Sequence, residues 1–176
     1  LGWTFNDYGP DYAGIQDPRT GGEFGGLNPA PIGSRGEGVL ALIRTDGVDL
    51  HALSHITGGG LAANLARVLP EGVLARLDRS TWTPPPVFTV VGELGRVPRA
   101  DLERTLNMGV GFVAMLPADQ AALAMRTMET RGIPAWVIGE VTAADAAPVE
   151  PGVEVVRGTK GVEGGVVQVV GEHPLG

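Results

Sequence analysis

The 176-residue chain contains no cysteine and has few basic residues, with 13 lysines and arginines against 20 aspartates and glutamates. The lack of cysteine excludes disulfides, thiolate metal sites and cysteine nucleophiles, and it fits a reducing compartment. The net charge of −7 argues against a nucleic-acid partner, because a phosphate backbone requires a basic surface. The same acidity argues against electrostatic binding to an anionic membrane.

Long apolar runs are also missing. No segment could span a bilayer, and no charged-then-apolar signal peptide opens the chain. Aromatic residues make up only 5%, but the hydrophobic fraction of 43% is enough for a core. The length predicts one domain with an additional arm. Because the chain starts at Leu1 rather than at methionine, we expect a fragment or a processed piece.

Glycine and proline are abundant and unevenly distributed. Residues 1–38 contain "DPRTGGEFGGLNPAPIGSRGEG" and show no helical or strand period, which predicts an irregular entry segment. Residues 39–141 have the patterns of a folded α+β domain. Residues 142–176 form a valine-rich tail, whose pieces "VEVV" and "VVQVV" could pair as a hairpin.

Apolar periodicity places the elements of the central domain. We predict strands at 48–56, 73–78, 108–116 and 135–141, helices at 61–69, 84–95 and 117–131, a single helical turn at 101–106, and either a helix or a strand at 39–45. The predicted buried stripe of the 117–131 helix consists of Ala121, Ala122, Met125 and Met128. The helices are short and none follows the last strands. We therefore expect a two-layer α+β sandwich, in which helices cover one face of a mostly antiparallel sheet, rather than a doubly wound parallel sheet.

The run "HALSHITGGGLAANLARVLPEG" (51–72) is the first candidate site. A strand that ends in three glycines before a helix can direct backbone N–H groups at a phosphate or carboxylate. The alternative is a tight turn that needs a positive φ, for which one glycine would suffice. Three adjacent glycines favour an anion site. The spacing matches neither the Walker loop nor the dinucleotide fingerprint.

Three polar side chains accompany this loop. His51 and His55 share a face of the predicted strand, and His55 lies at the strand end, where it could neutralise a phosphate or transfer a proton. His51 is better explained as a satisfied polar residue at a strand end. Asn64 lies one turn into the helix, where it could reach back over the loop to a ligand or face water.

Two further motifs are weaker. In "RTLNMGVGF", Asn107 precedes an apolar strand and is explained by an asparagine-initiated turn. The segment "VRGTKG" (156–161) has the composition of a phosphate loop but precedes no helix, so we expect a hairpin turn. No Ser-His-Asp arrangement or EF-hand loop is present.

Four pieces in order resemble the carboxy-terminal half of the aminoimidazole ribonucleotide synthetase family, also called phosphoribosylformylglycinamidine cyclo-ligase. They are "VDLHALSHITGGGLAANLARVLPEG", "LDRSTWTPPPVFTVVGELG", "LERTLNMGVGFVAMLP" and "AWVIGEV". Leu106 stands where the family usually has phenylalanine. The resemblance covers residues 39–141. The family's amino-terminal half is not found, and residues 1–38 do not resemble the usual entry into the second half.

The resemblance implies an ATP-driven ring closure in de novo purine biosynthesis, in which ATP phosphorylates the formyl amide oxygen, the amidine-side nitrogen attacks that carbon, and phosphate leaves. ATP and Mg²⁺ would be held mainly by the amino-terminal half. It also implies a cytoplasmic homodimer and a phosphorylated ribonucleotide substrate. The corresponding site residues are the catalytic His55 and a phosphate-binding set, with no metal ligand: Thr57, Gly58, Gly59, Gly60, Asn64 and Asn107.

Two alternatives remain open. One is a related kinase or synthetase of the same architecture, although the "LNMG" and "HITGGG" runs point away from these enzymes. The other is a binding module that holds a phosphorylated ligand without catalysis. We expect the isolated chain to be inactive in either case, because the nucleotide loop and the Mg²⁺ carboxylates of the family are not found in it.

Overall fold

The computed structural model describes residues 2–3, 32–145, 153–158 and 164–174, with residues 2–3 and 32–37 described by their backbone only. The predicted α+β class and the mostly antiparallel pairing are confirmed. In chain order the elements are β1 (Gly2–Trp3), α1 (Ile32–Ile43), β2 (Ala52–His55), α2 (Gly60–Ala66), β3 (Val73–Asp78), η2 (Arg79–Thr81), α3 (Pro86–Gly95), α4 (Arg99–Thr105), β4 (Phe112–Met115), η3 (Ala118–Gln120), α5 (Ala121–Glu129), β5 (Ala135–Trp136), β6 (Gly139–Ala143), β7 (Glu154–Arg157) and β8 (Val166–Val170).

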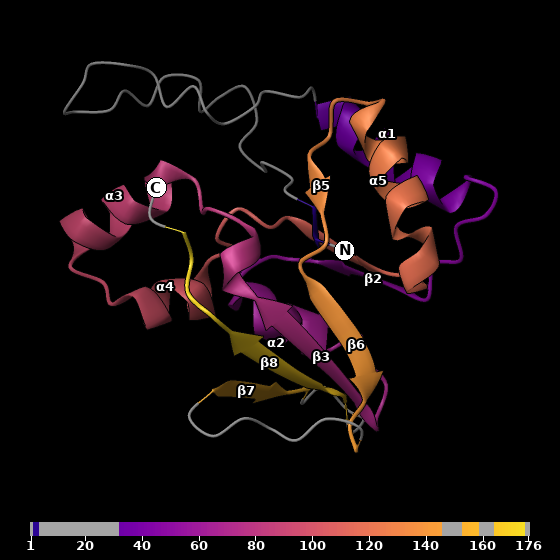
Figure 1. Ribbon diagram of the computed structural model, residues 1–176. Helices are drawn as coiled ribbons and strands as arrows, with labels where there is room; N and C mark the ends of the chain where they lie inside the picture. The colour runs from indigo at the N-terminus through magenta and orange to yellow at the C-terminus, as the bar shows by residue number, and fades with distance from the viewer. Residues whose placement is uncertain (1, 4–31, 146–152, 159–163, 175–176) are drawn as a thin grey trace.

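The described strands form two sheets of four strands each (Figure 1). The first has the order β2-β4-β1-β5, and all its neighbours are antiparallel. The second has the order β6-β3-β8-β7, in which β3 and β8 run parallel and the other pairs are antiparallel. β7 and β8 pair as an antiparallel hairpin, and β8 also lies directly beside β3. The segment "VRGTKG" continues from β7 into residues outside the described part of the chain.

The predicted strand at 135–141 is two strands in two different sheets. β5 belongs to the first sheet and β6 to the second, with only Val137 and Ile138 between them. At the start of β6, a Cβ on Gly139 would overlap the backbone of Arg76 in β3. Glycine therefore allows the chain to enter the second sheet at this point, and the apolar run alone did not reveal the change of sheet.

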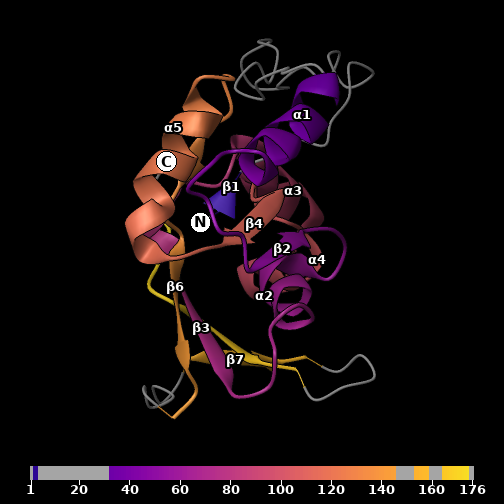
Figure 2. The same cartoon turned by 90° about the vertical axis from the view of Figure 1, so that its right-hand side faces the viewer.

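The first sheet separates two cores. On one side Leu61 and Leu65 of α2 pack with Val113 of β4 and with the inner face of the second sheet. On the other side, α1 and α5 cover the sheet, as Figure 1 shows in the upper right. There Leu42 of α1 and Met128 of α5 pack with Ala114 of β4. A third cluster, Phe88, Leu102 and Met108, joins α3 to α4. Figure 2 shows α5 and α1 at the end of the molecule opposite β7.

Local chemistry explains most element ends. Pro86 occupies the first turn of α3, where its missing N–H costs no helical hydrogen bond, and Arg96 closes the helix in the left-handed conformation at φ 51°. Of the segment 39–45, for which the sequence allowed helix or strand, residues 39–43 belong to α1, which begins at Ile32 and so earlier than residue 39. β4 is shorter than predicted, because Met108 and Gly109 have positive φ values and form a turn.

The predicted stripe of α5 is partly wrong. Ala124 and Met128 are fully buried, Ala121 and Met125 are half-buried, and Ala122 is exposed. Residues 121, 124, 125 and 128 follow the i, i+3, i+4, i+7 spacing of one helix face, whereas Ala122 lies about 100° around the axis from Ala121. The helix also starts later than predicted, because the 3₁₀ turn η3 occupies Ala118–Gln120, where the sequence predicted an α-helix from Pro117.

Candidate functional site

The glycine loop, defined here as Thr57–Gly60, connects β2 to α2. Gly59 and Gly60 have φ values of +100° and +76°, in the left-handed region that favours glycine. A Cβ on Gly60 would also overlap the Glu103 carbonyl of α4, whereas nothing lies within 4 Å of a Cβ on Gly58. The backbone therefore requires glycine at two of the three positions, and only Gly58 faces open space.

Asn64 binds the loop itself. Its side chain is buried, and Nδ2 donates to the carbonyls of Thr57 at 3.2 Å, Gly58 at 3.3 Å and Gly60 at 2.7 Å. Its Oδ1 accepts hydrogen bonds from Thr57 Oγ1 at 3.4 Å and from Arg67 Nη1 at 3.3 Å. The Asn64 side chain therefore does not face water. It reaches back over the loop, where it fixes the loop carbonyls.

One of the backbone N–H groups that we expected to face a ligand instead forms a hydrogen bond within the protein. The N–H of Gly59 donates to the Thr105 carbonyl at the end of α4, at 3.3 Å. Helix α2 has only seven residues, so its dipole is short. Thr57 and Gly58 are exposed and form the accessible part of the loop.

The two histidines differ in their surroundings. Ser54 points toward α2, where its Oγ donates to the Asn64 carbonyl at 3.0 Å. Because successive side chains of a strand alternate, His55 lies on the opposite face of β2, and its exposed ring stacks on Phe112 with centroids 5.0 Å apart. Phe112 packs against the core beneath α1 and α5. His51 is exposed just before β2, and its Nε2 lies 3.2 Å from Asp49 Oδ2.

Asn107 forms the turn that the sequence favoured. Its Oδ1 accepts the N–H of Gly109 at 3.1 Å, and its carbonyl accepts the N–H of Val110 at 2.9 Å. The carbonyl of Met108, within this turn, accepts the indole N–H of Trp82 at 3.1 Å. Asn107 thus connects α4 to β4, while Thr57, the glycines and Asn64 form one compact unit.

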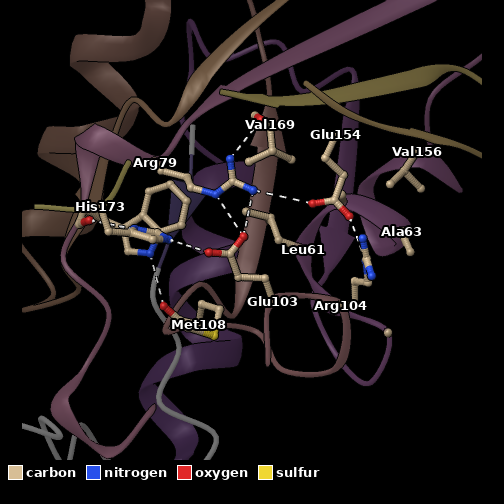
Figure 3. A pocket seen from close by; sticks show the side chains of 13 residues that line it. Leu61, Ala63, Arg79, Glu103, Arg104, Met108, Glu154, Val156, Val169 and His173 are labelled. Carbon is tan, nitrogen blue, oxygen red and sulfur yellow. Dashed lines mark hydrogen bonds and ion pairs between the residues drawn. The ribbon is translucent and has the colours of Figure 1, made fainter. Parts of the chain in front are cut away.

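The sequence analysis missed a charged cluster that lines a cavity of about 70 Å³ next to the loop (Figure 3). Its members come from η2, α4, β7 and the segment after β8, and we call them the ionic cluster: Arg79, Glu103, Arg104, Glu154 and His173. Gly59 of the glycine loop lines the same cavity, beside the apolar side chains of α2 and β8.

Arg79 is the centre of the ionic cluster, as Figure 3 shows. Its Nε and Nη2 donate to Glu103 Oε2 at 2.9 and 2.8 Å, and Nη2 also lies 3.5 Å from Glu154 Oε2. Arg104 Nε donates to the other oxygen of Glu154 at 3.1 Å. His173 Nε2 lies 3.5 Å from Glu103 Oε1, and its ring meets Trp82 edge-on at 4.4 Å.

Glu103 remains ionised at this buried position. Burial alone would raise the pKa of its carboxyl group, but the hydrogen bonds from His173 and Arg79, together with their positive charge, lower that pKa to about 2. The side chains of Arg79 and Glu103 are only 17% and 15% exposed, so water weakens their attraction little. The ionic cluster is thus a compensated set of charges.

Among the described residues, no group of three or more histidine, aspartate or glutamate side chains is placed to hold a metal ion. In the same part of the chain, no helix is both long enough and apolar enough to cross a membrane.

Comparison with known proteins gives the same family as the sequence motifs. Residues 20–150 match the family described as AIR synthase related protein, C-terminal domain. A Streptomyces fradiae protein, provisionally named phosphoribosylformylglycinamidine cyclo-ligase, is 56% identical over 103 residues, which are 58% of this chain and 56% of that protein. The phosphoribosylformylglycinamidine cyclo-ligase of Symbiobacterium thermophilum is 47% identical over 97 residues, 55% of this chain and 28% of that protein. The chain thus spans about half of one relative and less than a third of the other.

Proposed function

The chain belongs to the family of AIR synthase related proteins, C-terminal domain, and on that premise we propose that it is the carboxy-terminal portion of an ATP-dependent cyclo-ligase. The complete enzyme would convert formylglycinamidine ribonucleotide and ATP to aminoimidazole ribonucleotide, ADP and phosphate, in the cytoplasm and as a homodimer. The observation that carries this proposal is the match over residues 20–150, supported by the cyclo-ligase names of the relatives.

In this proposal the glycine loop receives an anionic group of the ribonucleotide. Thr57 and Gly58 are exposed, and the open space at Gly58 lets an anion approach the backbone closely. Asn64 and Asn107 act indirectly, because Asn64 fixes the loop carbonyls and Asn107 fixes the turn after α4. Gly59 and Gly60 supply the backbone conformation.

ATP and Mg²⁺ belong to the amino-terminal half in this proposal. The described residues offer no cluster of acidic side chains for a divalent cation, so none of them is assigned to Mg²⁺. When bound by the complete enzyme, ATP would supply the phosphoryl group that activates the formyl oxygen. This chain would orient the substrate beneath it.

The test combines this chain with a separately expressed amino-terminal half of a cyclo-ligase. We expect aminoimidazole ribonucleotide, ADP and phosphate to form only when both halves are present. The matched control replaces this chain with the corresponding piece of the Symbiobacterium thermophilum relative. Activity with the control piece but none with this chain would contradict the proposal. Binding of a phosphorylated ribonucleotide without turnover would support the binding-module alternative.

His55 is the candidate proton acceptor. Its ring is exposed at the end of β2, so it could meet a substrate held between the two halves. In the reconstituted enzyme His55→Ala should lower kcat by roughly 10²–10⁴-fold, as loss of a general acid or base does. His51→Ala is the matched control and should leave kcat nearly unchanged. Equal small effects at both positions would remove His55 from the chemistry.

A further inference from the structure

The glycine loop rests on the backbone of α4. The Gly59 N–H donates to the Thr105 carbonyl at 3.3 Å, and Gly60 lies so close to the Glu103 carbonyl that a Cβ would not fit. A shift of α4 would therefore move the hydrogen-bond acceptor of the loop and the surface against which Gly60 packs. The position of the loop depends on the position of the second half of α4.

The side chain of Glu103 holds this part of α4 in place. Its Oε2 accepts two hydrogen bonds from Arg79, and its Oε1 lies 3.4 Å from Arg99 Nε and 3.5 Å from His173 Nε2. Arg104, the next residue, is bound to Glu154 of β7. The pKa of Glu103, lowered to about 2, keeps the carboxylate charged and the pairs intact at neutral pH.

Two partners connect Glu103 to the last described segment of the chain, because Arg79 binds carbonyls of that segment and His173 belongs to it. Arg79 Nη1 donates to the carbonyls of Val169 at 2.9 Å and Gly171 at 3.5 Å. His173 has a nearly buried side chain, and its Nδ1 lies 3.2 Å from the Trp82 carbonyl.

Residues 153–158 and 164–174, the last described residues, lie outside the region matched by the family, which ends at residue 150. They nevertheless supply Glu154, two backbone carbonyls and His173 to the ionic cluster. The charged side chains around the cavity bind one another. This mutual pairing indicates a contact that joins chain segments, which we call the joint, rather than an open site for a charged ligand.

We propose that Glu103 and His173 are positioning residues, through which residues 153–158 and 164–174 hold α4 and thereby the glycine loop in its binding conformation. The effect on substrate rests on the proposed function, while the effect on loop geometry does not. The inference assigns a role in the site to a segment beyond the family match.

The first experiment measures amide hydrogen exchange by NMR in the full chain, without substrate. The reporter is the Gly59 N–H, bonded to Thr105, and the reference is the Ile56 N–H, which donates to the Gly111 carbonyl at 2.8 Å in the adjacent strand pair. Glu103→Gln and His173→Gln should each accelerate exchange at Gly59 by about tenfold or more relative to Ile56, as expected if the bond to α4 opens locally. Glu129→Gln on α5 and His51→Gln are exposed controls that should change neither amide.

Equal changes at Gly59 and Ile56, or no change at Gly59, would overturn the inference, because the cluster would then contribute only to global stability. If Glu103→Gln fails to fold, His173→Gln carries the test, since it leaves the Arg79–Glu103 pair in place.

The second experiment uses the reconstituted enzyme. His173→Gln should raise KM for the phosphorylated ribonucleotide by about tenfold, equivalent to a tenfold weaker binding constant, with little change in kcat or in KM for ATP. An unchanged KM for the ribonucleotide would show that the joint does not set the binding conformation. If even the unmodified chain is inactive, the proposed function fails while the exchange experiment still decides the effect on the loop.

Discussion

The glycine loop and the ionic cluster share a cavity wall but are built in opposite ways. The loop consists of consecutive residues, is bound almost wholly through backbone groups and Asn64, and exposes Thr57 and Gly58. The ionic cluster unites charged side chains from distant segments, and its central pair is largely buried. The loop is thus suited to receive a ligand, whereas the cluster is suited to hold its neighbours in place.

The three consecutive glycines of the loop do not all serve the same purpose. Gly59 and Gly60 are required by φ and by contact with α4, and Gly58 is required by neither. The structural and the functional interpretations of the run apply to different positions.

The largest effect is expected from Gly60→Val. The new side chain would overlap the Glu103 carbonyl and would be forced into the left-handed region, so we expect a loss of about 4 kcal/mol or more in the free energy of unfolding. Urea unfolding measures it. Gly58→Val is the matched control, because the space there is open, and it should cost less than about 1 kcal/mol. Equal losses at both positions would remove the distinction between them.

The next largest loss of stability is expected from truncating the core side chain of α2, the helix that follows the glycine loop. Leu65 of α2 is 1% exposed, and Leu65→Ala should cost about 2–5 kcal/mol, as truncation of a buried side chain does. Met125 of α5 is only half-buried, so Met125→Ala should cost less, about 1 kcal/mol. Chemical unfolding of both variants gives the comparison. A larger loss for Met125→Ala would mean that α5, rather than α2, anchors the domain.

The third effect tests the ionic cluster by pH. The Glu103 pKa falls from 4.5 to about 2 on folding, so the unfolded state binds the proton more tightly. The stabilisation is therefore complete above about pH 4.5 and is lost as the pH falls toward 2. It amounts to about 3 kcal/mol, which is the pKa difference converted to free energy. Unfolding curves from pH 7 to pH 2.5 should be steeper in pH for the unmodified chain than for Glu103→Gln. Parallel pH profiles would show that Glu103 is not specifically stabilised.

The smallest effect is expected at His55, on the face of β2 away from α2. His55→Ala removes an exposed ring stacked on Phe112, and the unfolding free energy should fall by less than about 1 kcal/mol. Thermal unfolding measures the change, and His51→Ala serves as its control. A loss above 2 kcal/mol would mean that the ring is part of the core.

The elements that depend on local sequence were predicted well. Residues 73–78 form a strand with the predicted bounds, and the helix predicted at 84–95 is α3, which begins at Pro86. The short apolar run of the strand and the prolines and Gly95 of the helix act within a few residues. The turn at Asn107 is equally local. By contrast, the start of α5 depended on a 3₁₀ turn, and the split at Val137 depended on a contact between Gly139 and β3.

The ionic cluster could not be read from the chain. Arg79 and Glu103 are 24 residues apart, and His173 lies 70 residues beyond Glu103, so no spacing rule connects them. Their burial, rather than their identity, distinguishes them from surface charges, and burial follows only from the packing of α4 and β8 on α2. The sequence also could not show on which side of the sheet His55 lies. Alternation along β2 separates its residues into two faces but does not show which face packs against α2.

The place of β8 in the second sheet has a consequence during synthesis of the protein. Leu74 of β3 pairs with Val166, and 166 − 74 = 92 residues separate them. At a translation rate of roughly 5–20 residues per second, β3 leaves the ribosome roughly 5–20 s before its parallel neighbour is made. Through that interval one edge of β3 lacks its strand, and the carbonyls of Val169 and Gly171 that bind Arg79 do not yet exist. If the segment around β8 positions α4 as we propose, the glycine loop, although complete in sequence by residue 60, reaches its final geometry only after β8 has been added.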